Sequence, residues 1–139
     1  MRRRARGAVR WWAEEQGQAF IEFALLLPIL SFLMVGGSDL ARAYAMQLAV
    51  QNGARAGAEA AAIGYDLTYD DIKGHVEDEM NRTPGMDATT AVVNVSYPTS
   101  GGANYVRVEV QYTYRTIVAW PLLPNTASFD RATQFRTFP

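Results

Sequence analysis

The residue whose type and position could carry chemistry is Glu22, a carboxylate within an otherwise uncharged apolar stretch. It lies five residues after Gly17, and no further charge occurs before Asp39. An ionised carboxylate costs roughly 2.5–3.5 kcal/mol at the centre of a bilayer and less near its edge. A chain that keeps such a residue is expected to use it. If a peptidase cuts after Gly17, Gln18 becomes the first residue of the mature chain and Glu22 the fifth.

No enzyme-like set of residues accompanies Glu22. The single histidine, His75, is expected on the polar side of a short helix beside residues 77–79, where a solvated acidic face is favoured over a metal site. No serine has a histidine partner at a suggestive spacing. The chain has no cysteine, which excludes disulfide and thiolate chemistry. We therefore expect no catalytic residue, no metal, no cofactor and no enzymatic activity.

The apolar stretch predicts a membrane helix over about residues 18–38. It contains twenty-one residues with Glu22 as the only charge, and about 20 helical residues cross the hydrocarbon core. A cleaved secretory signal would have a shorter apolar region; this signal and a buried soluble helix are the alternatives.

The distribution of charge predicts the orientation of the chain in the membrane. Residues 1–17 carry five arginines and two glutamates, whereas the remainder carries eight basic and twelve acidic residues. Short arginine-rich flanks stay cytoplasmic, so the body should lie outside. A nucleic-acid partner is not expected, because its basic surface should lie on the folded domain.

The helix is expected to continue beyond the membrane and to end at Gly64, giving one helix over residues 18–63 of about 70 Å. Pro28 removes one helical hydrogen bond, and Gly36 and Gly37 are each roughly 1 kcal/mol less helical than alanine. We predict a bend near Pro28 and local unwinding at Pro28 or at the two glycines. A tolerated kink is the alternative to a functional hinge.

Small residues at four-residue spacing predict a packing ridge on the outer half of this helix. Such spacing lets helix backbones approach closely. Because the ridge drifts around the helix, either several neighbouring helices share it or the folded domain covers part of it. Alanine's helix propensity alone would explain the alanines but not the two glycines. The ridge comprises Ala41, Ala45, Ala49, Gly53, Gly57 and Ala61.

The remainder, residues 64–139, is predicted to be a small α+β domain. Thr68 should cap a short helix that presents Ile72, Val76 and Met80 on one face. Alternation then predicts three antiparallel strands over 91–97, 106–115 and 128–138. The short helix is expected to pack on one face of this sheet, where the outer half of the long helix could join it. Residues 98–104 should be a loop, and residues 119–125 an apolar connection that is not strand.

Three segments resemble TadE-type proteins, which are pilin-like proteins of the tight-adherence (Flp) branch of type IVb pilus systems. They read GQAFIEFALLLP at 17–28, DLARAY at 39–44 and NGARAGA at 52–58. Phe23 stands where Flp major pilins usually carry tyrosine, which favours the minor, TadE-like group. The resemblance implies a type IV pilin-like fold and a minor pilin or pseudopilin acting in pilus assembly.

The resemblance also implies roles for individual residues. Residues 1–17 would be a leader that prepilin peptidase removes after Gly17 on the cytoplasmic side. Glu22 would then serve insertion or assembly, together with Phe23 beside it. One helical turn separates Glu22 from the new α-amino group at Gln18, so it could pair with its own amine or with that of an adjacent subunit. The alternative is an interfacial carboxylate that reaches for water.

The implied partners are prepilin peptidase, other pilin or pseudopilin subunits, the pilus assembly platform and membrane lipid. The implied location is the cytoplasmic (inner) membrane, crossed once, with possible incorporation into a cell-surface pilus. A second hypothesis is a single-pass, membrane-anchored binding module that is neither cleaved nor assembled. A membrane-tethered enzyme is a third.

Overall fold

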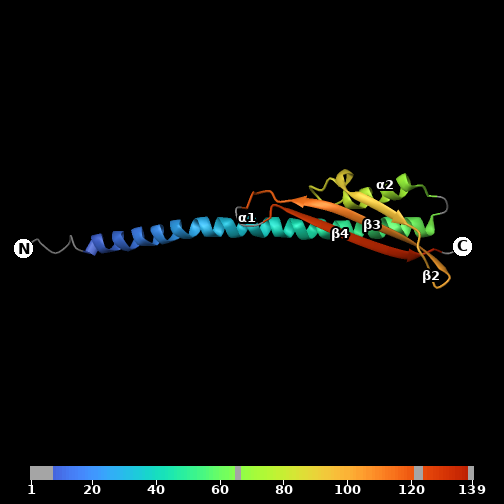
Figure 1. The fold of residues 1–139 in the computed structure, drawn as a ribbon. Coiled ribbons are helices and arrows are strands. Elements are labelled where there is room, and N and C mark those ends of the chain that lie inside the picture. Colours follow the sequence, from blue (N-terminus) through green and yellow to red (C-terminus); the bar gives the residue numbers. More distant parts are fainter. Residues whose placement is uncertain (1–7, 65–66, 121–123, 138–139) are drawn as a thin grey trace, which may run out of the picture. The chain divides into compact units, whose positions relative to one another are not determined.

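The computed structural model describes residues 8–64, 67–120 and 124–137, and side chains from residue 17 onward. The chain divides into two compact units, residues 1–38 and residues 39–139. Helix α1 (Ala8–Ile63) belongs to both, and the second unit adds a short helix and an antiparallel sheet (Figure 1). The predicted α+β fold is confirmed, but the sheet has four strands where three were expected.

Helix α1 begins at Ala8, ten residues before its predicted start. Residues 8–16 are mostly alanine, arginine, glutamate and other residues that are compatible with helix, so no stop signal precedes Gly17. The helix continues without interruption through Pro28, Gly36 and Gly37. The predicted local unwinding is therefore not present in this segment, while a bend at Pro28 stays a prediction.

The C-terminal end of α1 and the N-terminal end of the next helix follow the predicted stop and start signals. Helix α1 ends at Ile63, where the N–H of Gly64 donates to the carbonyl of Ala60 at 2.7 Å. Helix α2 (Tyr69–Met80) is capped by Thr68, whose hydroxyl accepts from the N–H of Asp71 while the Asp71 carboxylate accepts from the N–H of Thr68. This reciprocal pair satisfies two N–H groups that the first helical turn leaves unpaired.

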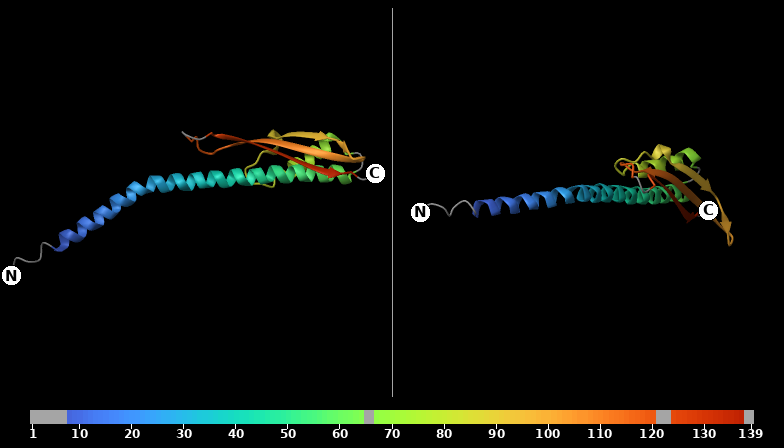
Figure 2. Two further views of the ribbon diagram at one scale, coloured as in Figure 1. Left: turned by 60° about the horizontal axis from the view of Figure 1, so that its bottom comes forward. Right: turned by 60° about the vertical axis from the view of Figure 1, so that its left-hand side comes forward.

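Strand β3 (Ala103–Arg115) is the centre of the sheet. It pairs antiparallel with β1 (Val92–Ser96) on one side and β4 (Thr126–Arg136) on the other. The left-hand view of Figure 2 shows β3 and β4 side by side along the green portion of α1. The third predicted strand was therefore placed two residues too late, and its last residue, Phe138, lies outside the described residues.

The unpredicted strand β2 (Thr99–Ser100) arises within the segment expected to be a loop. Gly101 and Gly102 both have positive φ, 59° and 76°, as the tightest hairpin turns require. The turn therefore closes at once, and Ser100 pairs with Ala103. Pro98 has no N–H to donate to a ladder, which separates β2 from β1.

The core of the second unit lies between the inner face of the sheet and the two helices. Val106, Val108 and Val110 of β3 are fully buried, and Val93 of β1 is nearly so. Helix α2 contributes the three apolar residues of its predicted stripe. From α1 the core receives Met46, Val50, Ala54 and Ala58.

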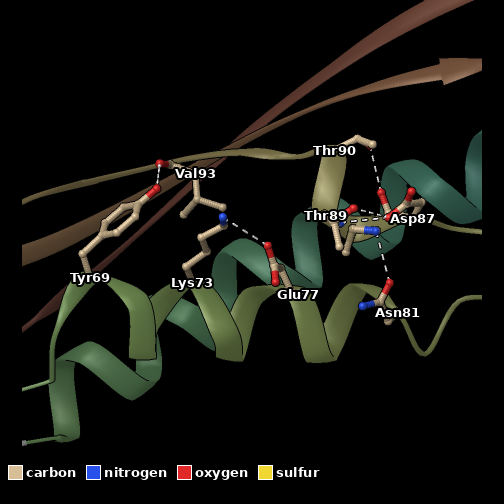
Figure 3. Close-up of polar contacts among 9 residues, drawn as sticks. Tyr69, Lys73, Glu77, Asn81, Asp87, Thr89, Thr90 and Val93 are labelled. Atoms are coloured by element: carbon tan, nitrogen blue, oxygen red, sulfur yellow. Dashed lines mark hydrogen bonds and ion pairs between the residues drawn. The ribbon is translucent and has the colours of Figure 1, made fainter.

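Polar contacts fasten α2 to β1 and to the 3-10 turn η1 (Ala88–Thr90) (Figure 3). The hydroxyl of Tyr69 donates to the carbonyl of Val93 at 2.9 Å. The side chain of Asn81 accepts from the N–H of Ala88 at 3.1 Å. The outer edge of β1 is thereby bonded to the first turn of α2, where the sheet would otherwise present an unpaired carbonyl.

Candidate functional site

The candidate assembly residue Glu22 lies exposed on α1, among side chains that are themselves exposed. Its Oε1 accepts a hydrogen bond from the side-chain amide of Gln18 at 3.1 Å. The two residues are one helical turn apart, which is the spacing at which side chains on a helix surface meet. Phe23, beside Glu22, is exposed as well. The described side chains of residues 17–38 thus leave the Glu22 carboxylate accessible.

The helix around Glu22 has the length and composition of a membrane span. Every described side chain from residue 18 to residue 35 is exposed, and this is the one described helix apolar and long enough to cross a bilayer. The hydroxyl of Ser31 donates to the carbonyl of Leu27 at 2.8 Å, so this polar group is satisfied within the helix, as hydrocarbon surroundings demand. One such helix suggests single-pass membrane anchoring.

The predicted cleavage position, Gly17, is open to contact. A β-carbon added at Gly17 would meet no atom within 4 Å, and the same holds for Gly37. Packing against the described side chains therefore requires neither glycine.

The predicted packing ridge divides into two parts. Ala49, Gly53 and Gly57 are buried and Ala61 is half-buried, whereas Ala41 and Ala45 are exposed. The folded unit therefore covers the later part of the ridge, which was one of the two outcomes foreseen.

The two ridge glycines contact α2 of the same chain. A β-carbon at Gly53 would lie 2.6 Å from Cγ of Met80, and one at Gly57 would lie 2.5 Å from Cγ2 of Val76. Real β-carbons do not approach other atoms so closely, so the absence of a side chain allows α1 and α2 to touch. In this chain the G-x-x-x-G pair of Gly53 and Gly57 therefore serves the packing of α1 on α2 in the core of the folded unit.

The second polar site of the molecule is Asp39, the first charged residue after the apolar stretch. Its side chain is 4% exposed. Oδ1 accepts from the hydroxyl of Tyr114 and the N–H of Ile117, both at 3.0 Å. Oδ2 accepts from the indole N–H of Trp120 at 3.1 Å and from the N–H of Val118 at 3.5 Å. One carboxylate thus holds the end of β3 and the connection that follows it.

These hydrogen bonds shift the titration of both partners. The hydrogen bond from the N–H of Ile117 is the main cause that lowers the pKa of Asp39 below its ordinary value of 3.8. Burial raises this pKa, whereas the hydrogen bonds from Trp120 and Tyr114 lower it further. Burial, followed by the bond to Asp39, raises the pKa of Tyr114 above its ordinary value of 10.0. At neutral pH the carboxylate is therefore ionised and the phenol protonated.

Sequence reasoning missed the role of Asp39. Tyr112 and Tyr114 are buried in the core. The available signal was the position of Asp39, a charge placed directly after an apolar stretch with a Tyr and a Trp at the end of the strand pattern. Nothing in the spacing indicated that residues so far apart in sequence would meet.

A comparison with known protein families finds a match, which lies within the first helix. The model of the family described as TadE-like protein matches residues 17–59. The match begins at Gly17 and ends near the C-terminal end of α1, so it includes Glu22 and Asp39 but no residue of the sheet. No curated protein and no solved structure matches the chain significantly.

Proposed function

We propose that this chain, a TadE-like protein of the tight-adherence pilus system, is a minor pilin that is processed after Gly17 and assembles through Glu22. The observation that carries the proposal is the family match over residues 17–59, which starts at the glycine and contains the glutamate. The match supports a structural role in the pilus, in which the protein acts by packing of helices and not by catalysis. Its partners in this role are prepilin peptidase, the assembly platform and other pilus subunits.

The geometry of the first helix supports an intermolecular role for Glu22. The carboxylate is exposed, and its single described partner is the side chain of Gln18. Cleavage after Gly17 would create a positive α-amino group at Gln18. In a low-dielectric environment an unpaired charge is expensive, so pairing between the carboxylate of one subunit and the amine of a neighbour favours one axial register.

The topology that completes this proposal has the arginine-rich N-terminus in the cytoplasm and residues 39–139 outside. Arginine-rich segments flanking a span stay on the cytoplasmic side, and residues 1–17 carry five of the thirteen basic residues. Incorporation into a pilus would then draw the helix from the membrane into the filament.

The test replaces Glu22 by glutamine in cells that build the pilus. Glu22→Gln keeps the size of the side chain and an oxygen for the Gln18 amide but removes the charge. We expect filaments in the sheared surface fraction to fall about tenfold or more, the effect of losing about 1.4 kcal/mol of pairing free energy. The amount of protein in the membrane should stay unchanged.

The matched control is Glu59→Gln, which removes an exposed carboxylate from the same helix outside the apolar stretch and should leave filament number unchanged. Normal filament number in the Glu22→Gln strain would refute an assembly role for this residue. It would favour the second candidate, an anchored binding module that is not assembled.

A further inference from the structure

We propose that residues 116–120, which follow β3, form a second membrane contact, in which Ile117, Val118 and Trp120 lie in the lipid headgroup region next to Asp39. The proposal goes beyond the pilin role and uses only one part of it, the anchoring of residues 18–38 in a bilayer. The partner is the surface of the same membrane.

The position of the connection follows from its attachment to Asp39. Asp39 is covalently next to Ser38, the last residue of the apolar stretch, and one helical residue advances only about 1.5 Å. The backbone N–H groups of Ile117 and Val118 and the indole of Trp120 all donate to this one carboxylate. The polar layer on each side of the hydrocarbon is roughly 5–7 Å deep, so groups bonded to Asp39 lie at its depth.

The side chains presented there suit a lipid interface. Ile117 is 63% exposed and Val118 38% exposed, and residues 116–120 carry no charge. On α1, one and five residues after Asp39, Leu40 is 73% exposed and Tyr44 is 68% exposed. Trp and Tyr concentrate where membrane and water meet, because their rings are apolar and their N–H or O–H groups are polar. Exposed apolar residues so placed lose contact with water on membrane binding.

Four backbone N–H groups of residues 116–120 are satisfied within the chain, as an apolar surrounding requires. Besides the two N–H groups bonded to Asp39, the N–H of Thr116 donates to the carbonyl of Asn125 at 3.0 Å, and the N–H of Trp120 donates to the Asn125 side chain at 2.6 Å. The hydroxyl of Thr116 donates to the carbonyl of Val118 at 2.8 Å. These polar groups would therefore not be left unpaired at the lipid surface.

The test uses the fluorescence of Trp120 in the full, uncleaved chain reconstituted in phosphatidylcholine vesicles. Trp11→Phe and Trp12→Phe leave Trp120 as the one indole of the sequence. Lipids brominated near the top of the acyl chains quench indoles that lie at the interface. We expect Trp120 to lose most of its fluorescence in brominated vesicles and to emit at shorter wavelength than in the protein unfolded in urea.

The matched control moves the indole to the far end of the sheet. The control keeps Trp11→Phe and Trp12→Phe and adds Trp120→Phe and Tyr97→Trp. Its single indole then lies at the exposed position between β1 and β2, where the same bromolipids should leave the fluorescence intensity unchanged. Vesicle flotation is measured on both proteins. Flotation with an unquenched Trp120 would overturn the membrane contact and leave the pilin proposal standing, as expected if a neighbouring subunit covers the connection. A protein that does not float at all would refute the anchoring on which both proposals rest.

Discussion

Two carboxylates at opposite ends of the apolar stretch have contrasting environments. Glu22 is exposed and accepts one described hydrogen bond, from Gln18 one turn away. Asp39 is buried and accepts from four donors that belong to the end of β3 and the connection after it. An exposed carboxylate in an apolar segment is available to another molecule, whereas a satisfied buried one organises its own chain. This contrast supports the assembly role proposed for Glu22 and gives Asp39 a structural role.

Replacing Asp39 by asparagine should destabilise the folded unit. An amide NH₂ would face groups that also donate, and each buried donor left without an acceptor carries a desolvation penalty. We expect the melting temperature of the detergent-solubilised full chain to fall on the order of 5–10 °C. Near-ultraviolet circular dichroism of the buried tyrosines reports the transition. Asp78→Asn, an exposed change on α2, serves as control and should melt like the wild type.

The pH dependence of stability gives the same substitution a second readout. The folded state lowers the pKa of Asp39 below 3.8, so the unfolded chain binds more protons in this range. The contribution of Asp39 is full above about pH 5 and is lost as the pH falls through the folded-state pKa. Asp71 behaves alike in the cap of α2, so Asp39→Asn should remove part of the acid sensitivity. An unaltered urea midpoint at every pH would contradict the role given to Asp39.

At the scale of elements, the contact between α1 and α2 depends on the two glycines of the ridge. Gly57 lies against Val76, which is fully buried. Helix α2 itself was predictable in detail, because its cap and its stripe of Ile72, Val76 and Met80 are local signals. The surface of α1 that contacts α2 was not predictable in this way. The ridge of small residues at four-residue spacing and the buried residues of α1 do not lie on the same side of the helix along its whole length. Only from Ala49 onward do the two coincide.

A pair of identical substitutions tests this contact. Gly57→Val should cost about 2–3 kcal/mol of unfolding free energy, since the added side chain overpacks a filled core. Gly74→Val makes the same change on α2 where a β-carbon meets nothing within 4 Å, and should stay within about 0.5 kcal/mol of the wild type. Urea unfolding of the full chain in detergent measures both. Equal stability of the two variants would show that Gly57 is not required for the packing.

The sheet shows the same division between local and long-range information. Strand β3 was predictable from strict alternation, since its inner residues are buried and its outer residues exposed. Strand β2 escaped prediction because two residues carry too little pattern. The connection after β3 was recognised as apolar and irregular, but its attachment to Asp39 joins residues more than seventy positions apart, a distance over which periodicity carries no information.

At the scale of the whole molecule, the apolar helix and the TadE-like match over residues 17–59 support the proposal of a membrane-anchored pilus component. The charge asymmetry predicts which end stays inside, the apolar stretch is the one described helix that could span a bilayer, and the TadE-like match covers that helix. The folded unit supplies its own core from α1, α2 and the sheet. What distinguishes a processed pilin from a permanent anchor is therefore confined to Gly17 and Gln18.

The most direct test is the N-terminus of the protein isolated from its own piliated cells, read by mass spectrometry. The account predicts a mature chain that begins at Gln18, and predicts that Gly17→Ala, which the helix accommodates without contact, keeps the uncleaved form. A chain from wild-type cells that begins at Met1, or at any residue beyond the apolar stretch, would contradict it.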